Sequence, residues 1–344
     1  MDYEILSGDT LVALWKNNEL QVLNEQLLPL YLKKIHNADM WLESRAIDSK
    51  RPNSRLLKKA LRMKEKDDLS TALKVNGATI IDNYWVRPIG SDLSYKDVEF
   101  NNDYFSTLAL KGSYRSFNYA TKRKTTHTQE LTNTGSFEKC WKLSQNGDCW
   151  MYKKANHDEL FSEVFIYELG VKLGFNMAVY EKGDGYVKSL DFTHGNVNFE
   201  PASSFMGDNE DYEDVVEALN EICPQAIPDY IKMIFMDTII ANPDRHTNNF
   251  GLLRDKKSGE LLGLAPNFDN NMALISRGPI SKQKSRDMLV SLFKNLMEYN
   301  PEYKQYIPTV TEEVITEVLR SVNMKVKSKE ITEFIMMRYK FIKE

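Results

Sequence analysis

The chain has 344 residues, of which 42% are hydrophobic and 27% charged, and its formal net charge is −4. This composition is typical of a globular protein with one or two domains, and it argues against nucleic-acid binding through bulk positive charge. No stretch approaches the roughly 20 apolar residues of a membrane span, and the acidic start MDYEILSGDT lacks the layout of a signal peptide. Three cysteines without metal-like spacing, Cys140, Cys149 and Cys223, predict reduced thiols and a cytoplasmic location.

Residues 1–125 are expected to form an accessory region of mixed helix and strand. Apolar residues recur every three or four positions over 23–35 and 53–63, which predicts two helices. Residues 71–86 could form a small helix-turn-helix, but a packed helix, a turn and a packed segment is the interpretation that we favour. The polar and basic segment 120–129 lacks periodicity and is typical of a linker or a mobile loop.

A small β-rich lobe is expected over residues 126–192. Two alternating, aromatic-rich stretches, 136–143 and 149–154, flank an Asn-Gly turn and predict a β-hairpin. A helix is expected over 156–174, where apolar residues recur with helical spacing and a glycine follows. A second hairpin is expected over 176–192, around the sequence Gly-Asp-Gly.

A helical lobe is expected over residues 193–344. Helices are predicted at 211–223 and 228–241, a strand-like run at 261–266, and three further helices near the C-terminus. A β-rich piece followed by a helical piece predicts an α+β fold with two lobes and a cleft between them.

A dense group of polar residues follows the apolar helix 228–241, in the sequence NPDRHTNNFG. Phosphoryl transfer from ATP needs a carboxylate near the attacking hydroxyl and hard oxygen ligands for Mg²⁺. We expect Asp244 to be the base or orienting group, and Asn249 and Asp269 to be the metal ligands. The alternative is a solvated turn in which Asp244 and Asn249 cap local backbone groups.

The sequence predicts less specific roles for two residues close to Asp244. Arg245 could steady a phosphate or pair with an acid, and the residue pattern leaves both open. His246 is expected to orient the loop by a backbone hydrogen bond rather than to take the proton, although it stays a candidate catalytic residue.

The nucleotide is expected to bind in the β-rich lobe. Along CWMYKK, strand alternation places Lys153 with the small apolar side chains, whereas Lys154 points outward. A lysine that faces phosphates needs an acid to hold it, and Glu163 in the following helix is the expected partner. Glu159 is the competing candidate, and a surface ion pair is the alternative reading.

These motifs resemble the HipA-like serine/threonine kinase family, the kinase toxins of bacterial toxin–antitoxin systems. The matching sequences are NPDRHTNNFG, LAPNFDNN, SEVFIYELGVKLG and TGSFEK, within residues 130–290. The resemblance implies Asp244 as catalytic base, Asn249 and Asp269 as Mg²⁺ ligands, and Lys153 as a contact of the ATP phosphates. It also implies nucleotide contacts from the loop and hinge residues Thr134, Gly135, Ser136, Phe137, Glu138, Lys139, Ser189, Leu190, Asp191 and Phe192.

The resemblance further implies a two-lobed, protein-kinase-like α+β fold and an ATP- and Mg²⁺-dependent kinase that acts on a Ser or Thr hydroxyl of a protein substrate. Such kinases can phosphorylate a hydroxyl residue of their own phosphate loop, which here would be Thr134 or Ser136. An antitoxin-type partner is possible, with nucleic acid involved only indirectly. The first 120 residues do not match the usual N-terminal subdomain of the family.

Two other classes of function stay open. A nucleotide-binding pseudokinase or DNA-binding module would use the basic residues near 71–86, namely Arg51, Arg55, Lys58, Lys59 and Arg62. A lipid or small-molecule kinase is the second alternative, because D-R-H-x-x-N is also similar to the catalytic loop of phosphoinositide 3/4-kinases. We prefer a protein substrate, since no membrane-binding feature is evident.

Overall fold

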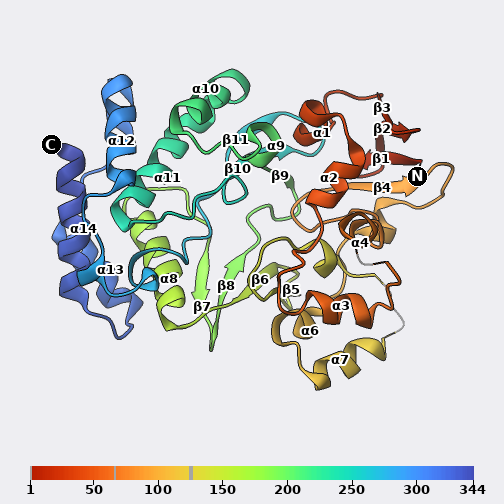
Figure 1. The fold of residues 1–344 in the computed structure, drawn as a ribbon, viewed down its shortest axis with the longest axis horizontal. Helices are drawn as coiled ribbons and strands as arrows, with labels where there is room; N and C mark the ends of the chain where they lie inside the picture. Colours follow the sequence, from red (N-terminus) through yellow and green to blue (C-terminus); the bar gives the residue numbers. More distant parts are fainter. Residues whose placement is uncertain (1, 66, 124–126) are drawn as a thin grey trace. The chain divides into compact units, whose positions relative to one another are not determined.

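The computed structural model describes residues 2–65, 67–123 and 127–344 (Figure 1). The chain packs into two compact units, each assembled from separate segments. The first unit extends to Lys154 and includes Lys188–Glu200 and Leu253–Glu260; the second contains Ala155–Val187, Pro201–Leu252 and Leu261–Glu344. These boundaries differ from the lobes expected at 126–192 and 193–344. Those lobes stay a prediction, because a unit of packing does not define a functional lobe.

The first unit begins with a four-stranded antiparallel sheet made of β1 (Tyr3–Ser7), β2 (Thr10–Lys16), β3 (Glu19–Val22) and β4 (Tyr84–Pro88). Its strand order is β3-β2-β1-β4. Asn17 and Asn18, between β2 and β3, both have positive φ, at 52° and 63°. Two consecutive left-handed residues match the tight type I′ hairpin turn. The strands of this sheet were not located from the sequence, although this Asn pair is a turn signal.

Three short helices complete the core beside this sheet: α1 (Leu30–Ile35), α2 (Ala38–Ser44) and α4 (Asp68–Leu73). The helix expected over 23–35 is therefore shorter, because Pro29 is accommodated only at a helix start. The helix-turn-helix considered for 71–86 is wrong. Helix α4 ends at Leu73, left-handed Asn76 and Gly77 turn the chain, and β4 follows.

The rest of the first unit holds a second core, formed by helices and the predicted hairpin. The elements are α3 (Ser54–Ala60), α5 (Tyr95–Val98), α6 (Ser106–Lys111), α7 (Tyr114–Thr121), the 3₁₀ helix η1 (Gln129–Thr132), β5 (Lys139–Leu143) and β6 (Cys149–Lys154). Strands β5 and β6 are antiparallel and confirm the hairpin, with Lys139 opposite Lys153. Figure 1 shows α3 close to α6 and β5. Part of the linker expected at 120–129, residues 124–126, lies outside the described residues.

The second unit is mainly helical and confirms the helices expected in this part of the chain. They are α8 (His157–Lys172), α10 (Tyr212–Ile222), α11 (Ile227–Ile240), α12 (Met288–Tyr299), α13 (Glu312–Val322) and α14 (Ser328–Lys343). The short helix α9 (Ser203–Met206) was not predicted. Almost every residue of α11 is buried, because α10, α12 and α14 pack around it (Figure 1). Helix α11 is thus a rigid support for the loop that follows it.

Five further strands belong to two sheets: β7 (Tyr180–Lys182), β8 (Tyr186–Leu190), β9 (Val197–Pro201), β10 (Gly251–Asp255) and β11 (Leu261–Leu264). The strand orders are β5-β6-β8-β7 and β11-β10-β9. The hairpin expected over 176–192 is confirmed as β7 and β8. The strand-like run at 261–266 is confirmed as β11.

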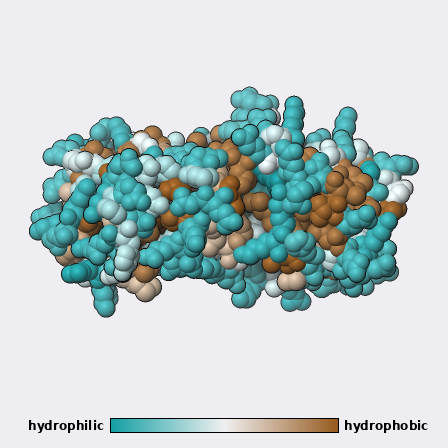
Figure 2. All heavy atoms as spheres, turned by 90° about the horizontal axis from the view of Figure 1, so that it is seen from above, coloured by the Kyte–Doolittle hydropathy of each residue, from teal (hydrophilic) through white to brown (hydrophobic). Residues whose placement is uncertain are grey.

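The surface and the cysteines agree with the expectations from composition. Hydrophilic side chains cover most of the face in Figure 2, with hydrophobic atoms between them. No helix in the described part of the chain combines the length and the apolar character that a membrane crossing requires. Cys140, Cys149 and Cys223 are all free thiols.

A buried ion pair ties three distant segments of the first unit together. Arg254 Nη1 lies 2.9 Å from Glu200 Oε1, and the Tyr84 hydroxyl donates to the same carboxylate over 2.8 Å. The guanidinium also donates to the carbonyls of Gln26, Leu28 and Gly259. Burial raises the pKa of Glu200, whereas the charge of Arg254 opposes that shift.

We expect Arg254→Met to lower the free energy of unfolding by about 3–5 kcal/mol, because it leaves the Glu200 carboxylate buried without its cation. Urea denaturation of the full chain measures this change. Arg115→Met, which alters an exposed arginine of α7, should change the free energy by less than about 0.5 kcal/mol. Equal effects of the two substitutions would contradict the structural role of Arg254.

Candidate active site

The polar loop after α11 is fixed at its start by a buried aspartate of that helix. Asp237 is fully buried, and α11 ends at Ala241, whose left-handed φ of 55° turns the chain. Asn242 then donates its backbone N–H to the Asp237 carbonyl and its side-chain Nδ2 to Asp237 Oδ1, both over 2.9 Å. The loop therefore leaves the helix in one defined direction.

Arg245 is the centre of the hydrogen-bond network in this loop. Its Nε and Nη2 donate to the two carboxylate oxygens of Asp237, over 2.8 and 2.9 Å. Its Nη1 donates to the carbonyls of Asn249 and Phe268, and Nη2 also donates to side-chain oxygens in the segment after β11. The two open readings of Arg245 are thus resolved in favour of pairing with an acid. One side chain links α11, the polar loop and the segment that contains Asp269.

The charge of Arg245 is stabilised by its surroundings. Burial alone would lower the pKa of Arg245, but the Asp237 carboxylate and, more weakly, Asp269 outweigh burial and raise it. Because the guanidinium stays charged, all five of its N–H groups remain donors across the whole accessible pH range.

Asp244 is half-buried, and its backbone is held on both sides. Its N–H donates to Asn242 Oδ1 over 3.1 Å, and its carbonyl accepts from the His246 N–H and from Asn249 Nδ2. The imidazole Nδ1 of His246 accepts from the Asn248 N–H over 3.3 Å, which is the loop-orienting contact expected of this histidine. The backbone around Asp244 is therefore preorganised by neighbouring loop residues.

Asp269 follows β11 in an unusual backbone conformation. Its φ is +59°, and its N–H donates to the Tyr180 hydroxyl over 2.9 Å. The next residue, Asn270, donates its N–H to Glu163 Oε2 over 2.9 Å. Non-glycine residues with positive φ often mark functional positions, where the surrounding structure holds them in place.

Glu163 is fully buried in α8 and contacts the segment after Asp269, as described above. Its competitor Glu159 caps α8, because its carboxylate accepts from the Asn156 N–H over 2.8 Å. The expected partner Lys153 belongs to the first unit and Glu163 to the second. Their pairing stays a prediction.

Lys153 and Lys154 confirm the expected alternation along β6. Lys153 is 5% exposed, and its ammonium lies 4.8 Å from the centre of the Phe137 ring. Lys154 is exposed and pairs with Glu138 over 3.1 Å. Because Lys139 and Lys153 are direct cross-strand partners, their two basic side chains lie on the same face of the hairpin.

The other residues predicted to contact nucleotide lie in the first unit. Thr134, Gly135 and Ser136 are exposed, and Gly135 has a φ of 97° that favours glycine. At the expected hinge, the Asp191 N–H donates to the Cys149 carbonyl, and its buried carboxylate accepts from Thr193. Asp191 therefore caps a turn. The partly buried or buried residues among the predicted contacts are Phe137, Glu138, Lys139, Ser189, Leu190 and Phe192.

The expected metal ligands have chemistry that fits Mg²⁺. Asn249 uses its amide nitrogen in the bond to the Asp244 carbonyl, which leaves the amide oxygen as the atom to face a cation. Nearby, the buried Asn271 has neither side-chain polar atom bonded to any described residue, as occurs where water or a ligand is the partner. The described residues contain no cluster of three His, Cys, Asp or Glu side chains. Beside the Asp269 carboxylate, a cation here would take its other ligands from amide, phosphate or water oxygens.

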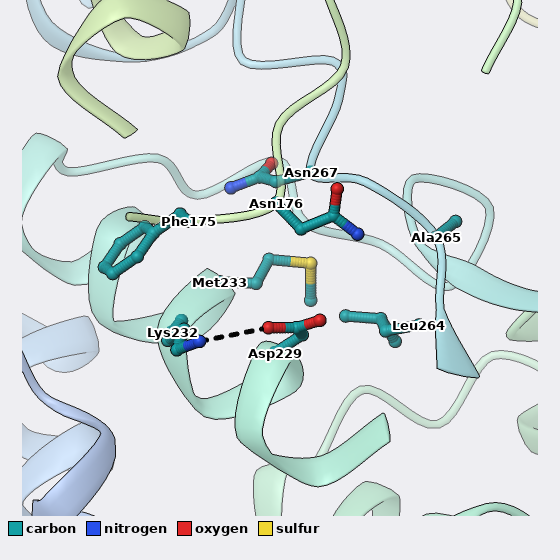
Figure 3. Close-up of a pocket in the computed structure, with 8 residues that line it drawn as sticks. All are labelled: Phe175, Asn176, Asp229, Lys232, Met233, Leu264, Ala265 and Asn267. Carbon is teal, nitrogen blue, oxygen red and sulfur yellow. Dashed lines mark hydrogen bonds and ion pairs between the residues drawn. The ribbon is translucent and has the colours of Figure 1, made fainter. Parts of the chain in front are cut away.

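A small pocket lies beside this network in the second unit (Figure 3). It is lined by Phe175, Asn176, Asp229, Lys232, Met233, Leu264, Ala265 and Asn267. In Figure 3, Asn176 and Asn267 lie opposite the ion pair between Lys232 and Asp229, which are 3.3 Å apart. None of the residues predicted for catalysis lines this pocket. It shares Asn267 with the Arg245 network.

Four residues of the network were not singled out from the sequence. They are Asp237, Asn242, Asn267 and Asn270. Asp237 had a usable signal, because it is an acid within the apolar helix sequence MIFMDTIIA, and a buried acid requires a partner. The two asparagines after β11 gave no such signal, since amides are common in loops.

The model of the HipA-like C-terminal domain family matches residues 121–329, which is more than half of the chain. The chain therefore belongs to this family, as the motifs indicated. The residues before 121 lie outside the family match. No curated protein sequence matches the chain significantly.

Two solved structures are similar to this one. HipA of Shewanella oneidensis MR-1, solved with HipB and operator DNA, aligns at 12% identity and a TM-score of 0.57, over 99% of this chain and 98% of that chain. The Helicobacter pylori proinflammatory kinase CtkA aligns at 18% identity and a TM-score of 0.43, over 59% of this chain and 89% of that chain. The HipA alignment confirms the expected α+β, kinase-like fold class and includes the N-terminal region.

We expect Asp237→Asn to lower the free energy of unfolding by about 3–5 kcal/mol, because it leaves the Arg245 guanidinium buried without its carboxylate. Asp244→Asn should lower it by less than about 1 kcal/mol, since Asp244 is held through its backbone. Guanidinium chloride denaturation of both variants measures these changes. It distinguishes Asp237, which has a structural role, from Asp244, the candidate catalytic residue. A larger loss for Asp244→Asn than for Asp237→Asn would contradict this division.

Proposed function

We propose that this HipA-family chain is an ATP- and Mg²⁺-dependent kinase of protein serine or threonine hydroxyls. The observation that supports this most is the Arg245 network, which connects the loop of Asp244 and Asn249 to the segment of Asp269. A single buried cation thereby bonds the Asn249 carbonyl directly, adjoins Asp244 in the chain, and holds the Phe268 carbonyl next to Asp269. Phosphoryl transfer depends almost entirely on positioning and electrostatics, so such rigidity suits it.

Asp244 would orient the substrate hydroxyl and accept its proton. The hydroxyl oxygen forms a bond to the γ-phosphorus, the bond to the β,γ-bridging oxygen breaks, and ADP carries away that electron pair. His246 would keep the loop in place through its bond to the Asn248 N–H. The half-buried position of Asp244 leaves it accessible to a substrate while its backbone stays fixed.

The Asn249 amide oxygen and the Asp269 carboxylate would hold Mg²⁺, which neutralises negative charge on the phosphates when bound. Lys153 would contact the phosphates, with Glu163 as its partner. Glu163 accepts a hydrogen bond from the Asn270 N–H. If Lys153 also pairs with Glu163, the same carboxylate holds both the lysine and the segment that contains Asp269.

The loop Thr134–Lys139 would bind the phosphates, and Ser189–Phe192 would lie near the adenine. The register of the hairpin, with Lys139 opposite Lys153, places two basic residues next to this loop, which supports the assignment. Lys139 Nζ would lie 2.7 Å from a Cβ placed on Gly135, so the ammonium sits directly over the loop backbone. Thr134 or Ser136, both exposed, would be the site of autophosphorylation.

The proposed functional lobes are residues 126–192 and 193–344, preceded by the accessory region 1–125. HipA of Shewanella oneidensis was solved with HipB and operator DNA. By analogy of fold, we propose an antitoxin-type protein partner for this chain, with any contact to DNA made through that partner.

We expect Asp244→Asn to reduce phosphate transfer by about 10²- to 10⁴-fold, because the hydroxyl loses its base. The measurement is incorporation of labelled γ-phosphate into the protein and into a generic protein substrate. Asp208→Asn, at an exposed acid, serves as the control and should retain the full rate. If the unmodified chain binds ATP but transfers no phosphate, it is a pseudokinase and the proposal is wrong.

We expect Asp269→Asn to raise the Mg²⁺ concentration needed for half-maximal activity by about tenfold or more, because a charged ligand becomes neutral. Titrating Mg²⁺ after EDTA treatment measures this shift. Asp244→Asn should lower the maximal rate but leave the Mg²⁺ requirement unchanged. An unchanged Mg²⁺ requirement in Asp269→Asn would remove Asp269 from the metal site.

A further inference from the structure

Two buried side chains of the first unit hold both ends of loop 134–138, which comprises Thr134–Glu138. The loop leaves η1 at Asn133 and enters β5 at Lys139. Its first three residues are exposed, whereas Arg51 and Glu130 are only 1% and 2% exposed. Each of these two side chains contacts the chain on both sides of the loop.

Arg51 contacts the loop ends through its guanidinium fork. Nη1 donates to the Asn133 carbonyl over 2.9 Å, and Nη2 donates to the Lys139 carbonyl. The two nitrogens are a fixed distance apart in a rigid plane. Two backbone positions that flank five loop residues are therefore held at one separation.

Glu130 makes the complementary contacts. Its Oε2 accepts from Asn133 Nδ2 over 3.1 Å, and its Oε1 accepts from the Trp141 N–H over 2.8 Å. Asn133 is thus held through its carbonyl by one side chain and through its amide by the other. Neither contact uses a residue of loop 134–138, whose last residue, Glu138, instead accepts from the Lys154 N–H over 2.8 Å.

Arg51 belongs to the N-terminal region, whereas the loop that it holds belongs to the family domain. Arg51 precedes α3 and lies outside the family match at 121–329, whereas the loop lies inside it. Ile47, four residues earlier, donates its N–H to the Leu131 carbonyl over 2.7 Å, which ties the same N-terminal segment to η1. Figure 1 places α3 close to α6 and β5, within the same unit.

We propose that Arg51 and Glu130 are positioning residues for nucleotide binding, which clamp loop 134–138 in the shape that accepts the phosphates of ATP. The N-terminal region thereby supplies part of the nucleotide site of the family domain. This inference rests on the proposed kinase function. Neither residue touches substrate, so each acts through the loop.

The test uses the full chain with Arg51→Lys, which keeps the buried charge but loses the fork. We expect the KM for ATP to rise about tenfold and kcat at saturating ATP to change less than about threefold, because the loop contacts phosphates in the ground state. Arg55→Lys, at an exposed residue of α3, is the matched control and should change neither constant.

A second measurement does not depend on ATP. Hydrogen exchange of the peptide spanning residues 133–141 should be faster in Arg51→Lys and in Glu130→Gln than in the unmodified chain, because the loop ends open more often. Exchange in β1 and β2 should be unchanged, which distinguishes a local release from global destabilisation. Glu130→Gln is nearly isosteric, so it decides the matter if Arg51→Lys does not fold.

The ionisation of Glu130 adds a pH signature. Burial raises the pKa of Glu130 to about 7, against the opposing effects of Arg51, Asn133, the Trp141 N–H and Lys139. Below this pH the protonated carboxyl resembles glutamine, and above it the carboxylate accepts both bonds. The ratio of ATP affinities between the unmodified chain and Glu130→Gln should therefore be near one at acidic pH and increase above neutrality.

The possible results separate the two proposals. If the unmodified chain binds no ATP, the kinase function is wrong, and the nucleotide role of the clamp is wrong with it. If it binds ATP but exchange at 133–141 and the KM for ATP are the same in both variants, the clamp alone is wrong. Faster exchange with a raised KM and a pH-dependent affinity ratio would support the clamp.

Discussion

The bidentate contact between Arg245 and Asp237 is the interaction on which the candidate site depends. Both groups are buried, so neither charge could remain there without the other. Because the guanidinium has donors beyond those that Asp237 uses, it also holds the Asn249 and Phe268 carbonyls. The loop of Asp244 and Asn249 and the segment of Asp269 are consequently held through backbone carbonyls.

The first unit applies the same principle with other arginines. Arg254 joins Glu200 and three backbone carbonyls, and Arg51 joins the two ends of loop 134–138. In each case a planar fork connects an irregular segment to the end of a strand, β9 at Glu200 and β5 at Lys139. A lysine could supply the charge at these positions but not the fixed spacing of donors. A few buried guanidinium groups thus order the irregular segments. Burying each guanidinium costs desolvation free energy, and the several charge-assisted hydrogen bonds that it makes offset this cost.

The success of the sequence analysis varied along the chain for physical reasons. Helices α8, α10 and α11 and the β5–β6 hairpin carry long periodic patterns and clear stop signals, so their positions were predicted. The first sheet was missed because β1–β3 are short and contain runs of consecutive apolar residues. Such runs conceal the alternation of apolar and polar residues that marks a strand. The Asp244 loop was recognised from its density of polar groups. The support that Asp237 gives to this loop was not recognised. Asp237 and Arg245 come close only because the chain turns at Ala241, which has a left-handed backbone conformation.

The left-handed backbone at Asp269 limits which residues could replace it. Aspartate and asparagine tolerate this conformation better than most residues, because their short polar side chains bond locally. Glutamate would preserve the negative charge, yet its extra methylene would displace the carboxylate and its side chain is less suited to positive φ. The identity of this residue is thus set twice, by ligand chemistry and by the shape of the main chain. Among acids, only aspartate satisfies both demands.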